Sequence, residues 1–265
     1  MPTPTHTETQ PLAGRHAVVT GASRGIGAAI AQELARRGCA LTLIARKAEP
    51  LERLAAELTR AGATAHAIAA DLTHEHESAD AFARAAELGG APAILINNAG
   101  GAESAPFTRT DPALFQRMID LNLTSAYLAT RAVVPAMVKG GWGRIVNVAS
   151  TAGLKGYAYV SAYVTAKHGL VGLTRALALE FAKTGVTVNA VCPGYTDTPM
   201  LDASAELVAA KTKRDAAAIK TDFAASNPMG RLVAPAEVAA AVAFLCLPES
   251  ASITGAALPV AGGEV

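Results

Sequence analysis

A tyrosine and a lysine stand four residues apart in the stretch SAYVTAK, residues 161–167. On a helix, Tyr163 and Lys167 would lie on one face and could act on the same group. A free phenol has a pKa of about 10. A nearby cation favours the phenolate, so the pair could make Tyr163 an acid or base near neutral pH. A half-buried ring beside a solvated amine has the same spacing, so the rest of the chain must decide between the two interpretations.

A glycine-rich turn, TGASRGIG at residues 20–27, lies between the first predicted strand and the first predicted helix. Small residues at Gly21, Gly25 and Gly27 would let backbone N–H groups approach a pyrophosphate, while the positive end of the helix points at it. In the first strand–helix unit of a parallel sheet, this pattern indicates a dinucleotide site rather than a merely tight turn.

The end of the second predicted strand reads Ala45-Arg46-Lys47, without a carboxylate. In dinucleotide sites an acidic residue here suits a free ribose 2′-hydroxyl, and an arginine suits a 2′-phosphate. Arg24 adds a second cation on the same side. The sequence therefore favours NADP(H) and leaves NAD(H) open, and the alternative is that these cations are solvated loop residues.

Short apolar runs alternate with longer amphipathic stretches along the chain. This alternation predicts an α/β fold, a single-domain Rossmann-type doubly wound parallel sheet flanked by helices. A break or kink is expected around Pro135. The predicted strands are 16–21, 40–46, 65–72, 93–100, 143–150, 185–194 and 257–263. The predicted helices are 25–38, 50–62, one between 72 and 93, 111–138, 161–183 and 235–247.

Composition restricts the class of protein. The chain has 265 residues, 51% hydrophobic and 17% charged, which suits one domain at 12–265 behind a disordered tail at 1–11. A net charge of +1 predicts a small-molecule partner and no nucleic acid. The absence of a long apolar run or signal peptide predicts a cytoplasmic protein without membrane contact. Three separated cysteines and the polar turn around His74 and His76 predict no metal.

With NNAG at 97–100, Ser150 and YVTAK at 163–167 following the glycine turn in order, the chain resembles the short-chain dehydrogenase/reductase family over about residues 12–263. The resemblance implies that Tyr163 is the general acid that protonates a carbonyl oxygen. Lys167 would hold the nicotinamide ribose and lower the pKa of the phenol. Ser150 would hydrogen-bond the substrate oxygen, and Asn122 would support a water-linked proton relay behind the lysine.

The resemblance also implies cofactor contacts in the glycine turn, after the second and third strands, in NNAG, on the catalytic helix and in PGYTDTP at 193–199. The implied residues are Gly21, Ser23, Arg24, Gly25, Ile26, Gly27, Arg46, Asp71, Leu72, Asn98, Ala99, Gly100, Tyr163, Lys167, Pro193, Gly194, Thr196 and Thr198.

Residues 177–200 look most like 3-oxoacyl-thioester reductases, including the ketoreductases of polyketide synthesis. This resemblance implies an NADPH-dependent enzyme that interconverts a ketone and a secondary alcohol, the substrate being a CoA- or carrier-linked thioester. A dehydrogenase of a small cyclic or aromatic alcohol remains an alternative. A non-catalytic dinucleotide sensor would be expected to lack Tyr163 or Lys167, and the complete cofactor loop argues against a purely structural protein.

Two further expectations concern surfaces. Apolar positions recur at helical spacing in 200–230, which predicts a helical lid whose cations, Lys211, Lys213, Arg214 and Lys220, could attract the phosphates of a thioester carrier. The family resemblance implies a homotetramer built partly from the helices at 111–138 and 161–183 and from the last strand. Small residues of the second helix, from Ala162 to Ala176, would let a partner helix approach.

Overall fold

The computed structural model describes residues 10–265. Residues 1–9, most of the expected disordered tail, lie outside the described residues. A turn at residues 11–14 precedes the first strand, and within it Leu12 is buried and its N–H donates to the carbonyl of Arg37 over 3.0 Å.

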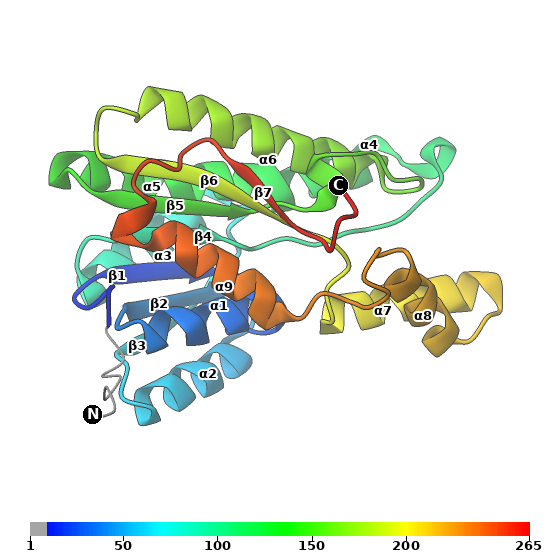
Figure 1. Cartoon of the computed structure of the whole chain (residues 1–265), viewed down its shortest axis with the longest axis horizontal. Coiled ribbons are helices and arrows are strands. Elements are labelled where there is room, and N and C mark those ends of the chain that lie inside the picture. The colour runs from blue at the N-terminus through cyan, green and yellow to red at the C-terminus, as the bar shows by residue number, and fades with distance from the viewer. Residues whose placement is uncertain (1–9) are drawn as a thin grey trace, which may run out of the picture.

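The strands of residues 10–265 form one parallel sheet in the order β3-β2-β1-β4-β5-β6-β7 (Figure 1). The predicted fold class is confirmed. After β3 the chain returns past β1 to form β4, so the order reverses between β1 and β4, where open α/β sheets bind ligands at their carboxyl ends. The strands are β1 (His16–Thr20), β2 (Ala40–Ala45), β3 (Ala65–Ala69), β4 (Ile94–Asn97), β5 (Gly143–Val148), β6 (Val186–Pro193) and β7 (Ala257–Val260).

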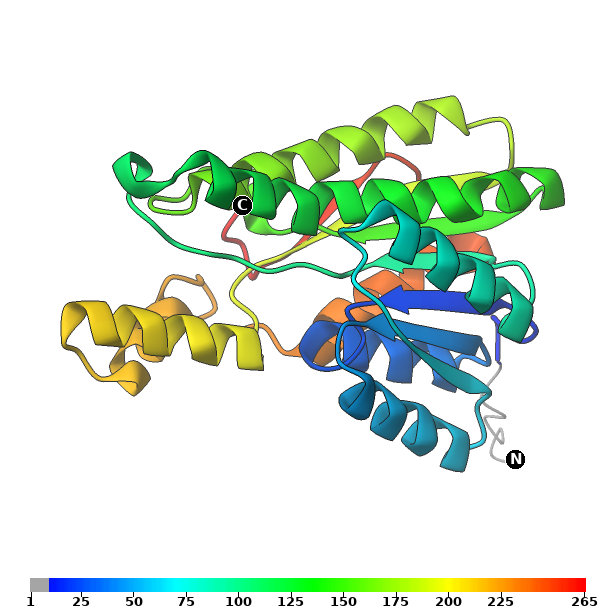
Figure 2. The same ribbon diagram turned by 180° about the vertical axis from the view of Figure 1, so that it is seen from behind.

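Helices cover both faces of the sheet (Figures 1 and 2). One face carries α1 (Gly25–Arg36), α2 (Ala48–Arg60) and α9 (Pro235–Cys246). The other carries α3 (Glu75–Gly89), α5 (Ser125–Gly140) and α6 (Ser161–Glu180). Within the described residues, no helix combines the length and the hydrophobicity that crossing a bilayer requires.

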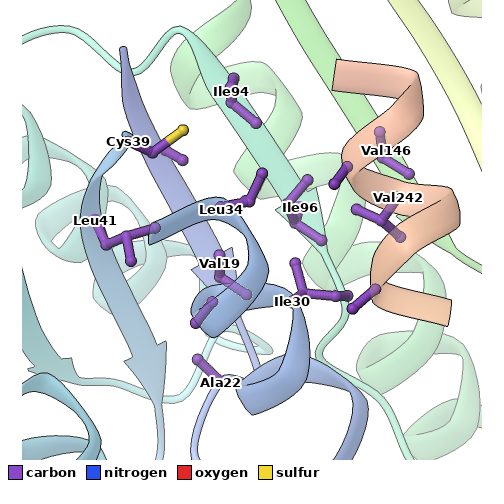
Figure 3. Close-up of a cluster of buried hydrophobic side chains, with 14 of the residues drawn as sticks. Val19, Ala22, Ile30, Leu34, Cys39, Leu41, Ile94, Ile96, Val146 and Val242 are labelled. Carbon is purple, nitrogen blue, oxygen red and sulfur yellow. The ribbon is translucent and has the colours of Figure 1, made fainter. Parts of the chain in front are cut away.

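The core has two halves because successive side chains of a strand point to opposite faces. Val19 of β1 belongs to the cluster under α1 and α9, and its neighbour Val18 to the cluster under α3 and α5. Figure 3 shows Ile30 and Leu34 of α1 and Val242 of α9 on the first side. Each of these buried side chains stabilises the fold by about 1.5–3 kcal/mol, and together they hold the turn between β1 and α1 in place.

The structure differs from the sequence prediction over 111–138. Two helices, α4 (Pro112–Ile119) and α5, are joined by a π-helical turn at Asp120–Thr124, and α5 continues through Pro135 to Gly140. The helix is therefore not broken at Pro135, although a break was one of the two outcomes expected there. Apolar periodicity runs through the whole segment, so the pattern gave no sign of the extra residue that a π-turn accommodates.

Two helices, α7 (Pro199–Thr212) and α8 (Ala216–Ala225), project from the body of the molecule after β6 (Figure 1). They pack on each other through a small apolar cluster that includes Ala205, Ala209 and Ile219. Leu207, predicted to belong to the apolar face, is instead 57% exposed. The remaining apolar face joins the two helices into one helical pair.

Candidate active site

Tyr163 and Lys167 lie one turn apart on α6, as the spacing predicts. The ammonium nitrogen of Lys167 is 5.7 Å from the centre of the Tyr163 ring and donates to the carbonyl oxygen of Val148 over 2.9 Å. Lys167 is 4% exposed, whereas Tyr163 keeps part of its surface accessible. The lysine is therefore anchored to the end of β5, and the phenol remains able to meet a substrate.

Burial governs the pKa values of this pair. Desolvation lowers the pKa of Lys167 to about 8. Desolvation also raises the pKa of Tyr163, and the nearby Ser150 side chain opposes that rise. The pKa of Tyr163 is therefore raised, whereas the sequence predicted that Lys167 would lower it. The structure thus favours a neutral phenol, a group that can give a proton to a substrate oxygen.

Ser150 lies just beyond β5, in the loop that leads toward α6. Its hydroxyl accepts from the backbone N–H of Ala152 over 3.0 Å, which fixes the side chain beside Tyr163. The hydroxyl hydrogen is then left to donate to a substrate oxygen. Ser150 and Tyr163 thus lie side by side, an arrangement in which both hydroxyls could donate to one oxygen.

Asn122 lies in the π-turn and is 1% exposed. Its side-chain nitrogen donates to the carbonyl of Gly101 over 2.9 Å, and its side-chain oxygen accepts from the Gly101 N–H over 3.1 Å. A methyl group placed on Gly100 would lie 2.8 Å from the Asn122 oxygen and 3.5 Å from the Lys167 nitrogen. Asn122 and Lys167 therefore flank Gly100 from two elements.

A groove of about 790 Å³ runs along the carboxyl ends of β1, β2 and β4. It collects most of the residues for which the sequence predicts cofactor contact. These are Gly21, Ser23, Arg24, Gly25, Ile26, Gly27, Arg46, Asp71, Leu72, Asn98, Ala99, Gly100 and Thr198.

The glycines of the first turn make the groove narrow and its backbone accessible. Gly25 has a φ of +58°, which disfavours other residues. A side chain on Gly27 would collide with the carbonyl oxygen of Gly21 and the amide nitrogen of Asn98. That amide donates to the carbonyls of Thr20 and Gly21 over 3.0 and 3.1 Å. The turn is therefore built around backbone atoms, as a pyrophosphate cradle requires.

The far end of the groove carries positive charge. Arg46 and Lys47 are exposed there. Partial burial acts to raise the pKa of Asp71, but hydrogen bonds from Thr73 and the charge of Arg46 outweigh it, so the pKa is lowered. Asp71 thus remains an anionic acceptor between the cationic end and the centre of the groove.

Several groove residues were absent from the sequence prediction. Arg53 and Pro50 come from the first turns of α2, and Leu121 and Ser125 from the π-turn and the start of α5. Arg53 also pairs with Glu49 over 3.1 Å. The available signal was the position of Arg53 in the second turn of α2, a helix that begins at Ala48 directly after the strand end.

Five predicted contacts lie outside the lining of the groove: Tyr163, Lys167, Pro193, Gly194 and Thr196. Thr196 is 6% exposed, and its hydroxyl donates to the carbonyl of Gly194 over 2.9 Å. Its side chain therefore shapes the loop after β6 from within. Thr198 closes that loop as the N-cap of α7, accepting from the Leu201 N–H over 3.4 Å.

Within residues 10–265, no three His, Cys, Asp or Glu side chains gather into a group that could hold an ion. His74 and His76 instead pair with Glu77 and Asp80 on the first turns of α3.

Comparison with known proteins gives consistent results. The family model for the short chain dehydrogenase matches residues 15–209. The cis-4-hydroxycyclohexanecarboxylate dehydrogenase of Sinomonas cyclohexanicum is 42% identical, covering 95% of this chain and 97% of that protein. The 3-oxoacyl-acyl-carrier-protein reductase of Pseudomonas aeruginosa is 38% identical, covering 95% and 98%.

Among solved structures, a variant of the actinorhodin polyketide ketoreductase with NADPH superposes with a TM-score of 0.92. It is 37% identical, and the match covers 97% of this chain and 98% of that one. A parallel sheet with a glycine cradle, a Tyr–Lys pair on one helix face and these relatives lead to one conclusion: the chain belongs to the short-chain dehydrogenase family.

Proposed function

We propose that the protein is an NADP(H)-dependent oxidoreductase that interconverts a ketone and a secondary alcohol. The observation that carries this proposal is the placement of Ser150, Tyr163 and Lys167 together at the carboxyl edge of the sheet, next to the dinucleotide groove. A non-catalytic sensor would have no need of this complete set of proton-handling side chains.

The groove fits the cofactor. Gly21, Gly25 and Gly27 would receive the pyrophosphate, and Arg46 with Arg24 would receive the ribose 2′-phosphate. Lys167 uses one of its three donors on Val148 and has the others for the nicotinamide ribose. The solved relative with NADPH supports the same preference.

When bound, NADPH supplies the hydride. The neutral phenol of Tyr163 donates its proton to the carbonyl oxygen, and Ser150 donates a hydrogen bond to the same oxygen. Lys167, positively charged below pH 8, stabilises the phenolate that remains. Asn122 holds the backbone around Gly101, so that water can reach the lysine from that side and return a proton to Tyr163.

For the substrate we favour a 3-oxoacyl thioester, in line with the Pseudomonas relative and the polyketide ketoreductase. The Sinomonas relative supports the alternative of a small cyclic alcohol. In either case α7 and α8 would act as the lid. Lys211 of α7 donates to the carbonyl of Ser104, in the segment that follows β4, over 3.3 Å.

The lid cations support carrier recruitment less than the sequence implied. Arg214 pairs with Asp222 over 2.7 Å, and Lys220 binds both Asp197 and Asp202 over 2.8 Å. These two charges are neutralised inside the lid. Any attraction of an anionic carrier arm would therefore depend on Lys211 and Lys213.

A homotetramer remains part of the proposal. An apolar groove of about 440 Å³ lies on the outer side of α5 and α6, and Tyr127 in it is 47% exposed. Of the small residues on α6, Ala162 and Ala166 are buried within the subunit, whereas Gly172 and Ala176 line this groove. Gly172 and Ala176 are thus available to contact a helix of a second copy.

The test is NADPH oxidation against acetoacetyl-CoA, an acyl-carrier thioester, a cyclic ketone and an aromatic ketone. The proposal predicts turnover with NADPH and a higher kcat/KM for the thioesters. Reduction of the cyclic ketone alone would favour the alcohol dehydrogenase. No turnover of any carbonyl compound, with cofactor binding intact, would favour a dinucleotide sensor.

A further inference from the structure

A second phenol lies close to Tyr163. Tyr195 follows Gly194 in the loop after β6, and β6 is the neighbour of β5, which leads into Ser150. The ring of Tyr195 stacks on Phe223 of α8, with centroids 4.6 Å apart and planes at 15°. It also meets the ring of Tyr157 edge-on, with centroids 6.4 Å apart. Tyr195 therefore stands where the catalytic loop and the lid helices converge.

The backbone of this loop is fixed. The carbonyl of Tyr195 accepts from the Val233 N–H over 2.9 Å, and the Gly194 N–H donates to the carbonyl of Val260 over 3.1 Å. With two ring contacts and a tethered backbone, the position of the phenol ring is set before a ligand arrives. Such preorganisation lowers the entropic cost of a ligand contact.

The three nearby phenols differ in what their hydroxyls do. The Tyr157 hydroxyl is shared between Thr151, at 2.7 Å, and the carboxylate of Glu264. Tyr163 has its role beside Ser150. For the half-buried Tyr195, no hydrogen-bonding partner of the hydroxyl is found anywhere in residues 10–265. A half-buried hydroxyl without a protein partner is left to bond a ligand or water.

Electrostatics keep this hydroxyl a donor. Burial, and then the negative charge of Glu264, raise the pKa of Tyr195. Tyr195 is close enough to Tyr163 to act on its pKa, which is raised mainly by burial and in smaller part by Cys192 and then Tyr195, while Ser150 opposes the rise. Tyr195 thus stays protonated beside the reacting position.

We propose that Tyr195 is a specificity-determining residue, which donates a hydrogen bond to a second, uncharged oxygen of the substrate next to the reacting carbonyl. Tyr163 and Ser150 hold the oxygen that is reduced, and Tyr195 holds the other. The Glu264 carboxylate near Tyr195 is paired with Lys155 over 3.1 Å, so these charges offer no net positive charge to a second carboxylate, and a neutral acceptor is the better fit. A 3-oxo thioester or ester has such an oxygen two carbons from its ketone, whereas a simple ketone has none.

This inference rests on the proposed ketone reductase activity and narrows its substrate. The test compares the neutral thioester acetoacetyl-N-acetylcysteamine with a monoketone of matched length. Tyr195→Phe removes only the hydroxyl and keeps both ring contacts. The matched control is Tyr159→Phe, because the Tyr159 ring is 68% exposed. Thermal unfolding and the Kd for NADPH are measured for every variant.

Tyr195→Phe should lower kcat/KM for the thioester about threefold to tenfold, the size of one neutral hydrogen bond, mainly through KM. Its kcat/KM for the monoketone should stay within about twofold of the wild type, and Tyr159→Phe should change neither value. Equal losses on both substrates, or no loss on the thioester, would overturn the inference and leave the reductase proposal standing. A wild-type protein that reduces neither substrate would instead refute the reductase proposal.

Discussion

Burial of Tyr163 and Lys167 in one place disfavours the charged form of each. It raises the pKa of the phenol and lowers the pKa of the ammonium. An ammonium with a pKa of about 8 is mostly protonated at neutral pH and loses its proton when the pH rises slightly above neutral. The pair therefore suits proton delivery in the direction of ketone reduction.

Reduction should depend on the protonation of Lys167. Below pH 8 the lysine is cationic and stabilises the phenolate formed as Tyr163 gives up its proton. As pH rises through about 8 this charge is lost, so kcat/KM for reduction should fall. The measurement is the pH profile of kcat/KM with a saturating cofactor.

Lys167→Arg provides the control, since a guanidinium keeps its proton to a pKa of about 12 or more. The variant should be slower overall but should lose the decline near pH 8. An identical decline in the variant would assign it to another group.

Arg46 should distinguish the two dinucleotides. Arg46→Ala should raise KM for NADPH by a factor equivalent to about 1.5–3 kcal/mol, the range for a lost charge-assisted contact, with little effect on KM for NADH. Arg60→Ala is the matched control and should change neither KM, because Arg60 is an arginine of the last turn of α2 and does not line the groove. Equal effects of Arg46→Ala on the two cofactors would show that Arg46 does not bind a 2′-phosphate.

At the scale of elements, Lys220 ties the helical pair to the loop after β6. It is held by Asp197 of that loop and by Asp202 of α7, and these bonds raise its pKa. Lys220→Met should free α8, so that amide hydrogen exchange in 216–225 becomes faster while the sheet is unchanged. Added salt should have the same effect on the wild type, because the ion pair is partly exposed.

The control is Arg131→Met, which removes an exposed ion pair with Glu75 elsewhere in the molecule. Exchange in 216–225 should match the wild type in this control. If Lys220→Met also leaves exchange in 216–225 unchanged, packing alone holds α8 in place.

The strands and most helices could be predicted because their apolar periodicity is local. Predicted strand ends were too long wherever polar site residues continue an apolar run, as at Asn98–Gly100 after β4. The π-turn and the ion pairs of Arg214 and Lys220 could not be predicted. The first depends on backbone geometry without a sequence signature, and the second on contacts between two helices whose packing the periodicity leaves open.

The same limit applies at the site. The spacing of Tyr163 and Lys167 predicts that they share a helix face, and the structure has them so. The predicted lowering of the Tyr163 pKa was wrong. The pKa is raised, because desolvation depends on everything packed around the ring. The sequence predicts no role for the Tyr195 side chain, since its two ring contacts come from segments 38 and 28 residues away along the chain.

At the scale of the whole molecule, the groove on α5 and α6 predicts assembly. A side chain on Gly172 would meet nothing within 4 Å in the subunit, so Gly172→Arg should obstruct a partner helix without an internal clash. We expect the wild type to sediment as a tetramer and Gly172→Arg as a smaller species. Gly140→Arg is the matched control, because Gly140 also has open space and lies at the end of α5. A monomeric wild type at micromolar concentration would contradict the assembly.

The most direct measurement follows hydride transfer and its dependence on the Tyr163 phenol. NADPH carrying deuterium at the transferred position is mixed with a ketone substrate, and mass spectrometry follows deuterium on the carbinol carbon. The wild type should transfer it. Tyr163→Phe, which lacks only the phenolic oxygen, should bind NADPH with an unchanged Kd and transfer deuterium about two to four orders of magnitude more slowly. A variant that keeps a tenth of the wild-type rate, or a wild type that transfers none, would contradict carbonyl reduction through Tyr163.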